Sequence, residues 1–265
     1  MRFSDFFLKT QKEFPKDETA INARLLIKAN YISKLMSGSY SLLPLGFKVA
    51  EKIKNIIREE MNLLGTNELI MPALHPRSSW EPTKRWDGLK EIMYQFKDRG
   101  GKELGLGPTH EEIIASVAAK IINSYKDLPR AVYQIQTKFR DEPRAKSGLL
   151  RGREFTMKDL SSFHVDKNSL DKFYEEVKKA YTKIFQRCGL KTIITEASGG
   201  AFSQEFSHEF MVPAEVGEDE IIFCELCHFS QNTEIAENKA GEVCSGCKGG
   251  KLEKLKAIEA GNIFK

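Results

Sequence analysis

The stretch FRDEPRAKSGLLRGREFTMKD, residues 139–159, gathers basic side chains around one aromatic ring. The ring is Phe155, and the basic residues are Arg140, Arg144, Lys146, Arg151, Arg153 and Lys158. The segments on either side, VYQIQTKFRDE at 132–142 and REFTMKDLSSF at 153–163, alternate between apolar and polar residues as β-strands do. The stretch therefore predicts two adjacent strands joined by a charged loop.

The period of two within a strand decides which of these side chains share a face. Arg140 and Glu142 point the same way in the first strand, and Arg151 and Phe155 point the same way in the second. Adjacent strands can then present all four side chains together. Guanidinium groups pair with phosphate oxygens, a ring stacks on a purine, and a carboxylate accepts from its exocyclic amine. The set suits a nucleoside triphosphate, and an amphipathic hairpin with a solvated polar face is the alternative.

Composition bounds the class of protein. The chain has 265 residues, 41% hydrophobic and 29% charged, which is enough for one sizeable core or a core plus a small satellite. No run of about 18 apolar residues occurs, and the first residues are too charged for a secretory signal, so we expect a cytoplasmic protein with no membrane partner. The formal net charge of +4 is mild and does not by itself indicate nucleic acid, and no DNA partner is expected.

Hydrophobic periodicity predicts the main elements. Helices are expected over residues 17–36, 45–64, 110–125 and 169–187, and strands over 67–74, 132–142, 153–163, 191–197 and 220–224. Residues 93–106 are expected to form a hairpin that turns at Gly100 and Gly101. Strands that arrive as hairpins, without a regular βαβ rhythm, predict an α+β fold on an antiparallel sheet. The absence of a Walker loop and of G-x-G-x-x-G argues against the two common nucleotide folds.

The four cysteines of CELC and CSGC have the spacing of a zinc site. Cys224, Cys227, Cys244 and Cys247 form the pattern C-x2-C-x16-C-x2-C, which is typical of a zinc ribbon or knuckle. Each short pair can clamp one side of a tetrahedron. Four sulfur ligands leave no open position, so the predicted Zn2+ is structural, either as a clasp or as support for a contact with a partner molecule.

Several motifs carry a resemblance to a known family. FRDE followed by LLRGREFTMKD resembles motif 2 of class II aminoacyl-tRNA synthetases, and GPTHEE, YQIQTKFRDE and SHEF resemble the bacterial-type prolyl-tRNA synthetases. The likeness runs from about residue 3 to residue 219 and resumes at EAGNIFK. It implies a class II synthetase-type antiparallel sheet flanked by helices in residues 1–222 and a return segment in 252–265, and the cysteine spacing places a zinc-ribbon-like module between them, in 223–251.

The resemblance also implies an activity, proline-tRNA ligation. L-Proline would be activated with ATP, accompanied by Mg2+, to prolyl-adenylate and then transferred to tRNA(Pro). In the family the residue matching Arg140 binds the α-phosphate and the amino acid carboxylate, which makes it the catalytic candidate. Glu142 would face the adenine, Arg151 would reach the terminal phosphate, and Phe155 would stack on the base.

The proline pocket is expected at GPTHEE and SHEF. Thr109 and Glu112 have capping-box spacing, which explains those two residues but leaves Glu111 without a role. The resemblance assigns Thr109 and Glu111 to the secondary ammonium of proline, for which a carboxylate is the suitable partner in a closed pocket. It also assigns His208 to this pocket, and a structural core histidine is the alternative.

Two further expectations follow from the resemblance. Residues 45–72, a helix and a strand ending at Pro72, are similar to motif 1, which implies a homodimer. EAGNIFK resembles the approach to motif 3, so motif 3 and the anticodon-binding domain would lie outside these 265 residues. The chain would then be part of a longer enzyme, part of a split enzyme, or a degenerate relative. A noncatalytic synthetase-like protein that binds nucleotide or RNA is the second functional hypothesis.

Overall fold

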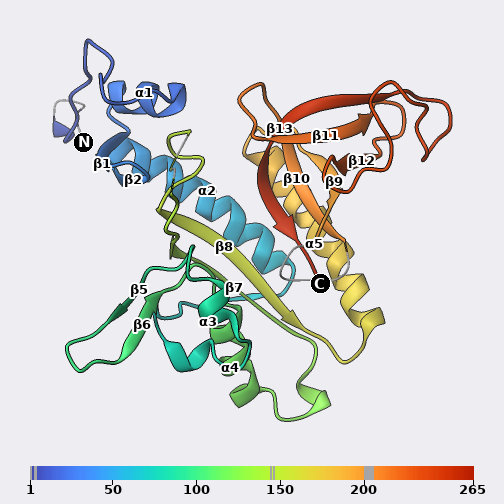
Figure 1. The fold of residues 1–265 in the computed structure, drawn as a ribbon, viewed down its shortest axis with the longest axis horizontal. Helices are drawn as coiled ribbons and strands as arrows, with labels where there is room; N and C mark the ends of the chain where they lie inside the picture. The colour runs from blue at the N-terminus through green and yellow to red at the C-terminus, as the bar shows by residue number, and fades with distance from the viewer. Residues whose placement is uncertain (1, 3–4, 144, 146, 200–205) are drawn as a thin grey trace. The chain divides into compact units, whose positions relative to one another are not determined.

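The computed structural model describes residues 2, 5–143, 145, 147–199 and 206–265. They form two compact units, residues 1–170 and residues 171–265 (Figure 1). Arg144 and Lys146 of the basic loop, and the part of the segment before SHEF at 200–205, lie outside the described residues. The fold is α+β with antiparallel sheets, as the sequence predicts.

A long hairpin dominates the first unit. β7 (Arg130–Phe139) and β8 (Glu154–Phe163) pair antiparallel along their whole length, and the short β3 (Asn67–Glu68) pairs parallel with β7. One face of the hairpin meets α2 (Pro44–Leu63), where the buried Tyr133 donates from Oη to Asn62 Oδ1 at 3.1 Å. Both strands and the helix predicted over 45–64 are confirmed.

A second, three-stranded sheet leads into the GPTHEE segment. β4 (Leu74–Pro76) and β5 (Gln95–Lys97) both pair with β6 (Glu103–Leu106), and the β5–β6 hairpin turns at Gly101 with φ +82°. Between β4 and β5 lie two short helices, η2 (Arg77–Ser79) and α3 (Arg85–Gly88). After β6 come α4 (Glu111–Ile121) and η3 (Tyr125–Asp127), so GPTHEE forms the connection between a sheet and a helix.

The helix predicted over residues 17–36 is wrong in its second half. α1 (Ile21–Lys28) is short, and β1 (Ile32–Met36) and β2 (Ser39–Leu42) follow it as a hairpin that turns at Gly38, with φ +78°. The helical spacing of Ile21, Leu25 and Leu35 was misleading, because these side chains are 52–80% exposed. The cluster that packs here is Ala23, Ile27 and Ile32. The strand predicted over 67–74 is likewise reduced to β3 and the start of β4.

The second unit is a barrel with a helix against it. α5 (Lys167–Arg187) begins just before the boundary, and its Tyr181 and Phe185 rings lie 5.5 and 5.4 Å from the ring of Phe210. The barrel has the order β10-β13-β11-β12-β9. Its strands are β9 (Ile193–Ala197), β10 (Ser207–Pro213), β11 (Asp219–Cys224), β12 (Ser230–Asn232) and β13 (Leu252–Ile263). β11 continues across the predicted boundary between residues 222 and 223. The predicted division of the chain into residues 1–222, 223–251 and 252–265 stays a prediction.

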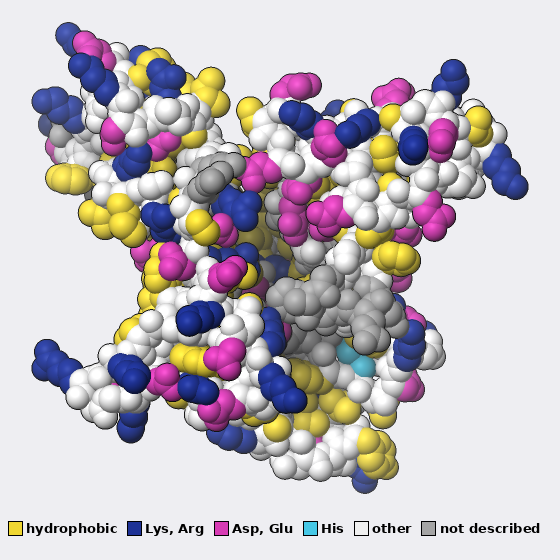
Figure 2. All heavy atoms as spheres, viewed as in Figure 1, with side chains coloured by type: hydrophobic (Ala, Val, Ile, Leu, Met, Phe, Trp, Pro, Cys, Tyr) yellow, Lys and Arg dark blue, Asp and Glu magenta, His cyan; other side chains and the backbone are white. Residues whose placement is uncertain are grey.

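Neither hydropathy nor charge in the described part of the chain points to one function. In the described part of the chain, no helix combines the length and apolar character needed to span a membrane. On the face drawn in Figure 2, Lys and Arg side chains are interspersed with Asp and Glu side chains, in keeping with the small net charge. We therefore infer function from local geometry.

Candidate active site and four-cysteine cluster

The β7–β8 register determines which side chains share a face. Lys138 lies opposite Phe155, and residues directly opposite each other in an antiparallel pair are on the same side of the sheet. Arg140 continues this register, since its backbone N–H donates to Arg153 O at 2.9 Å. The Arg140 guanidinium carbon lies 5.3 Å from the centroid of the Phe155 ring. Arg140 and Phe155 are therefore neighbours on one face, as the alternation predicts.

Glu142 holds the two arginines that precede β8. Arg151 Nε donates to Glu142 Oε2 at 3.1 Å, and Arg153 Nε donates to the backbone carbonyl of Glu142 at 3.0 Å. The Arg151 side chain is 53% exposed and that of Glu142 is 17% exposed. A carboxylate and a largely exposed guanidinium thus lie just beyond the ends of the two strands, and their assignment to ATP stays a prediction.

The polar residues of the GPTHEE segment lie beside Arg140 and do not form a capping box. The N-cap of α4 is His110, which makes no side-chain cap. Thr109 Oγ1 donates to Glu111 Oε2 at 2.5 Å, and Arg140 Nε donates to the preceding carbonyl, Pro108 O, at 3.4 Å. The GPTHEE segment and Arg140 are therefore adjacent. The Glu111 side chain is 40% exposed.

The capping-box explanation of Thr109 and Glu112 is wrong because Glu112 has other partners. Its Oε1 accepts from Thr83 Oγ1 at 3.1 Å and from an Arg85 guanidinium nitrogen at 2.9 Å. Glu112 is buried, so these contacts fix α4 against the segment around α3. The same Arg85 nitrogen is 3.7 Å from Glu111 Oε2.

Sequence reasoning missed a buried polar network behind this site. His75, His110 and Lys138 are all buried, and Lys138 Nζ lies 2.7 Å from Asp159 Oδ2. Burial lowers the pKa of His110 to about 4, and the positive charge of Lys138 acts in the same direction. Strand alternation places Lys138 on the Arg140 face, but the residues that cover it come from distant segments, so its burial has no sequence signal.

His208 lies in the second unit and has a defined hydrogen-bonding state. Its Nδ1 is 2.7 Å from Tyr174 Oη, which is also 2.9 Å from the carbonyl oxygen of Ile263. Since that carbonyl can only accept, the hydroxyl donates to it and accepts from His208 Nδ1–H. Burial lowers the pKa of His208, so its Nε2 is an acceptor in the neutral ring. The predicted role of His208 in proline binding stays a prediction.

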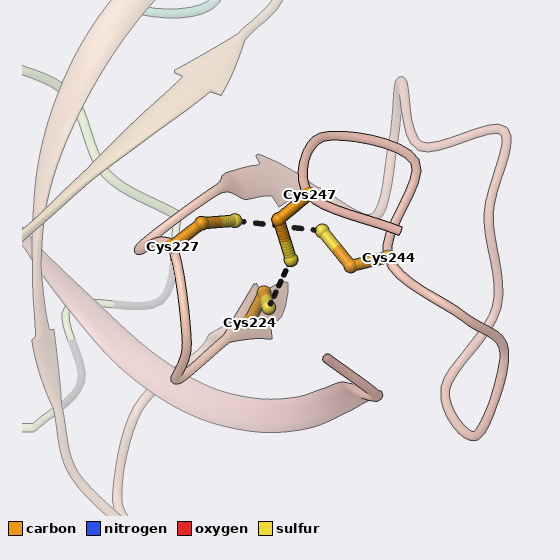
Figure 3. Close-up of side chains that lie close together, drawn as sticks. All are labelled: Cys224, Cys227, Cys244 and Cys247. Carbon is orange, nitrogen blue, oxygen red and sulfur yellow. Dashed lines mark hydrogen bonds between the residues drawn. The ribbon is translucent and has the colours of Figure 1, made fainter. Parts of the chain in front are cut away.

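The four cysteines converge at one end of the barrel (Figure 3). Their sulfur atoms all lie within 4.8 Å of one another, with Cys224 Sγ 3.8 Å from Cys247 Sγ and Cys227 Sγ 3.6 Å from Cys244 Sγ. A tetrahedral zinc with Zn–S bonds of about 2.3 Å requires sulfur atoms about 3.8 Å apart. Backbone N–H groups of Gly249 and Gly250 lower the pKa of Cys247 to about 6, which favours a thiolate. The cluster fits the chemistry of a structural zinc site.

The chain is similar to a known protein family and to curated proteins. A family model described as "tRNA synthetase class II core domain (G, H, P, S and T)" matches residues 94–243. The proline--tRNA ligase of Dehalococcoides mccartyi is 47% identical over 236 residues, which cover 89% of this chain and 42% of that protein. The corresponding protein of Brachyspira hyodysenteriae is 46% identical over 255 residues, which cover 96% of this chain and 44% of that protein. The chain thus spans less than half the length of these curated relatives.

Solved structures are similar in fold. A prolyl-tRNA synthetase from Cryptosporidium parvum, complexed with halofuginone and AMPPNP, matches with a TM-score of 0.66 at 18% identity, covering 71% of this chain and 41% of that one. The same enzyme complexed with L-proline and AMP matches with a TM-score of 0.63, also at 18% identity, covering 71% of this chain and 38% of that one. At this identity the likeness concerns the fold alone.

Proposed function

This chain belongs to the class II tRNA synthetase core-domain family, and on that premise we propose that the complete protein is a proline-tRNA ligase. It activates L-proline with ATP and transfers the prolyl group to tRNA(Pro). The observation that carries the proposal is the adjacency of Arg140, Phe155 and the Thr109–Glu111 pair within one unit. A surface suited to binding a triphosphate and a carboxylate suited to binding a cationic amine then lie side by side.

The proposed reaction has two steps. An oxygen of the proline carboxylate attacks the α-phosphorus of ATP, the bond to the bridging oxygen breaks, and pyrophosphate leaves with that electron pair. A hydroxyl at the 3′ end of the tRNA then attacks the carbonyl carbon of the adenylate, loses its proton, and AMP leaves. No nucleophile from the protein is needed, so this chain contributes alignment and electrostatic stabilisation.

Each side chain has a role that suits its position. Arg140 offsets the charge that develops on the α-phosphate, and Phe155 stacks on the adenine. Arg151, largely exposed and tethered by Glu142, meets the terminal phosphate, and Glu142 faces the adenine. Mg2+ prefers oxygen ligands and is expected to arrive on the ATP phosphates. Glu111 pairs with the ammonium of proline, with Thr109 holding the carboxylate in place.

The four-cysteine cluster is proposed to hold a structural Zn2+. Cys224, Cys227, Cys244 and Cys247 would be its ligands, a set whose sulfur spacing supports the assignment. When bound, the metal cross-links the ends of β11 and the loop before β13, and with four protein ligands it takes no part in the reaction.

We further propose that the complete protein is a cytoplasmic homodimer. α2 belongs to the segment similar to motif 1, and it leaves apolar side chains exposed. Phe47 is 52%, Val49 45% and Leu63 75% exposed. Exposed apolar side chains of this kind, together with the resemblance to motif 1, support a protein interface at α2.

Replacing Glu111 by glutamine tests the amino acid pocket. We expect the KM for proline in pyrophosphate exchange to rise about 10–100-fold, because a hydrogen bond to a charged group contributes about 1.5–3 kcal/mol. The KM for ATP should change little. Glu176→Gln removes the same charge from an exposed position of α5 and should leave both constants unchanged. An unchanged KM for proline in Glu111→Gln would refute the assignment.

A further inference from the structure

Lys138 carries an ammonium group into the interior of the first unit. Its side chain has no exposed surface, and burial lowers the pKa of Lys138 below its ordinary value. A buried ammonium is costly unless it is paired, and Lys138 Nζ lies 2.7 Å from Asp159 Oδ2 on β8. Asp159 also accepts from Gln134 Nε2 at 2.9 Å, so the counterion is itself held in place.

The second partner of Lys138 is His110. Nζ is in hydrogen-bonding contact with His110 Nδ1, and because an ammonium group can only donate, Nδ1 must be the unprotonated ring nitrogen. His110 is neutral at pH 7, since burial lowers its pKa to about 4. Its single ring proton is therefore on Nε2, which lies 3.1 Å from Pro72 O. The Gln136 amide nitrogen is also 3.2 Å from Nε2, but it donates to Met71 O at 2.9 Å.

Packing leaves the His110 ring little room to move. The His75 ring meets it edge-on with centroids 4.7 Å apart, and His75 Nε2 lies 2.9 Å from the same Pro72 carbonyl. A Cβ added at Gly107 would lie 2.5 Å from His75 Cε1, so the backbone of the GPTHEE segment already lies against these rings. The imidazole is thus fixed by Lys138 on one side and by Pro72 on the other.

We propose that Lys138 is a positioning residue for the amino acid subsite, acting through His110 on Thr109 and Glu111. This inference rests on the proposed function and adds a positioning residue to its amino acid subsite. His110 lies between these two residues in the chain and is the last residue before α4, so a fixed ring fixes the backbone from which both side chains project. Glu111 stays partly exposed and accepts from Thr109 Oγ1, which fixes the orientation of its carboxylate.

The position of Lys138 on β7 connects the two subsites. Lys138 precedes Arg140 by two residues on the same face, so one strand sets both the buried cation and the arginine assigned to the α-phosphate. The Glu111 carboxylate acts against burial on the pKa of Lys138, so the two charges interact. Lys138 contacts neither substrate in the proposed reaction, and its hydrogen bond to His110 acts on the shape of the proline pocket.

The test is a comparison of Michaelis constants in the complete protein. In Lys138→Met and Asp159→Asn, the KM for proline in pyrophosphate exchange should rise about tenfold or more, whereas the KM for ATP should change less than about twofold. Lys120→Met removes the same charge from an exposed position of α4 and should match the wild type. Equal increases in both constants, or no change in the KM for proline, would overturn the proposal.

A second readout does not depend on activity. The ring nitrogen-15 shifts of His110 in the wild-type protein should report a proton on Nε2 and an unprotonated Nδ1 at pH 7. A proton on Nδ1 would overturn the proposal even if the variants fail to fold. If the wild type supports no proline-dependent exchange, the proposed function fails, and the ring shifts still decide whether Lys138 fixes His110.

Discussion

Arg140→Ala is expected to lower the rate of proline-dependent pyrophosphate exchange by about 10³-fold or more. The reason is that a guanidinium aimed at a reacting phosphate stabilises charge that appears only in the transition state, in a site where water competes poorly. Arg140 is anchored for this task by its backbone bond to Arg153 and by the contact of its Nε with Pro108 O. Its guanidinium lies over the ring of Phe155, which is assigned to stack on the adenine.

The matched control is Arg130→Ala, at the other end of the same strand. Arg130 is exposed and lies opposite Phe163, far along β7 from Arg140, so its loss should leave exchange within about twofold of the wild type. Circular dichroism and the unfolding midpoint of both variants show whether the fold is retained. A folded Arg140→Ala protein that exchanges pyrophosphate at the wild-type rate would contradict the role of this residue.

Removing the zinc ligands should have the second large effect, on stability. Cys244→Ser replaces a buried sulfur, and we expect the zinc content to fall from about one ion per chain to near zero. The free energy of unfolding should fall by about 4 kcal/mol or more, because metal binding to a site that exists only in the folded state adds directly to folding stability. Denaturant unfolding and metal analysis of the same samples measure both quantities.

Cys188→Ser is the control for this experiment. Cys188 is half-buried and lies outside the cluster, so its substitution should leave the zinc content unchanged. A wild-type protein that contains no zinc, and whose unfolding midpoint does not respond to a chelator, would contradict the assignment of the cluster.

The face of the β7–β8 hairpin could be predicted from the sequence because a strand has a strict local rule. Alternation alone places Arg140 and Phe155 on one side, and the register confirms it. The cysteine spacing is informative for a similar reason, since two short pairs at a suitable distance can meet at one point. In both cases the signal is a regular spacing that can be read from the residues themselves.

The elements that could not be predicted depend on distant partners. Lys138 looks like any polar strand residue, yet it is buried by His110, which precedes it by 28 positions. The segment after Asn30 has helical spacing, but Asn30 adopts φ +61° and the chain returns as a hairpin that packs Ile32 into the core. β13 was missed because its burial comes from pairing with both β10 and β11, which its own irregular pattern does not reveal.

The most direct measurement of the central claim is the amino acid dependence of pyrophosphate exchange into ATP by the complete, zinc-loaded protein. We predict exchange that requires L-proline and is at least about 100-fold slower with threonine, serine or glycine, because the pocket must hold a secondary ammonium beside the adenylate site. A folded protein that binds ATP but shows no exchange with proline would contradict the account and favour a noncatalytic synthetase-like protein that binds nucleotide or RNA.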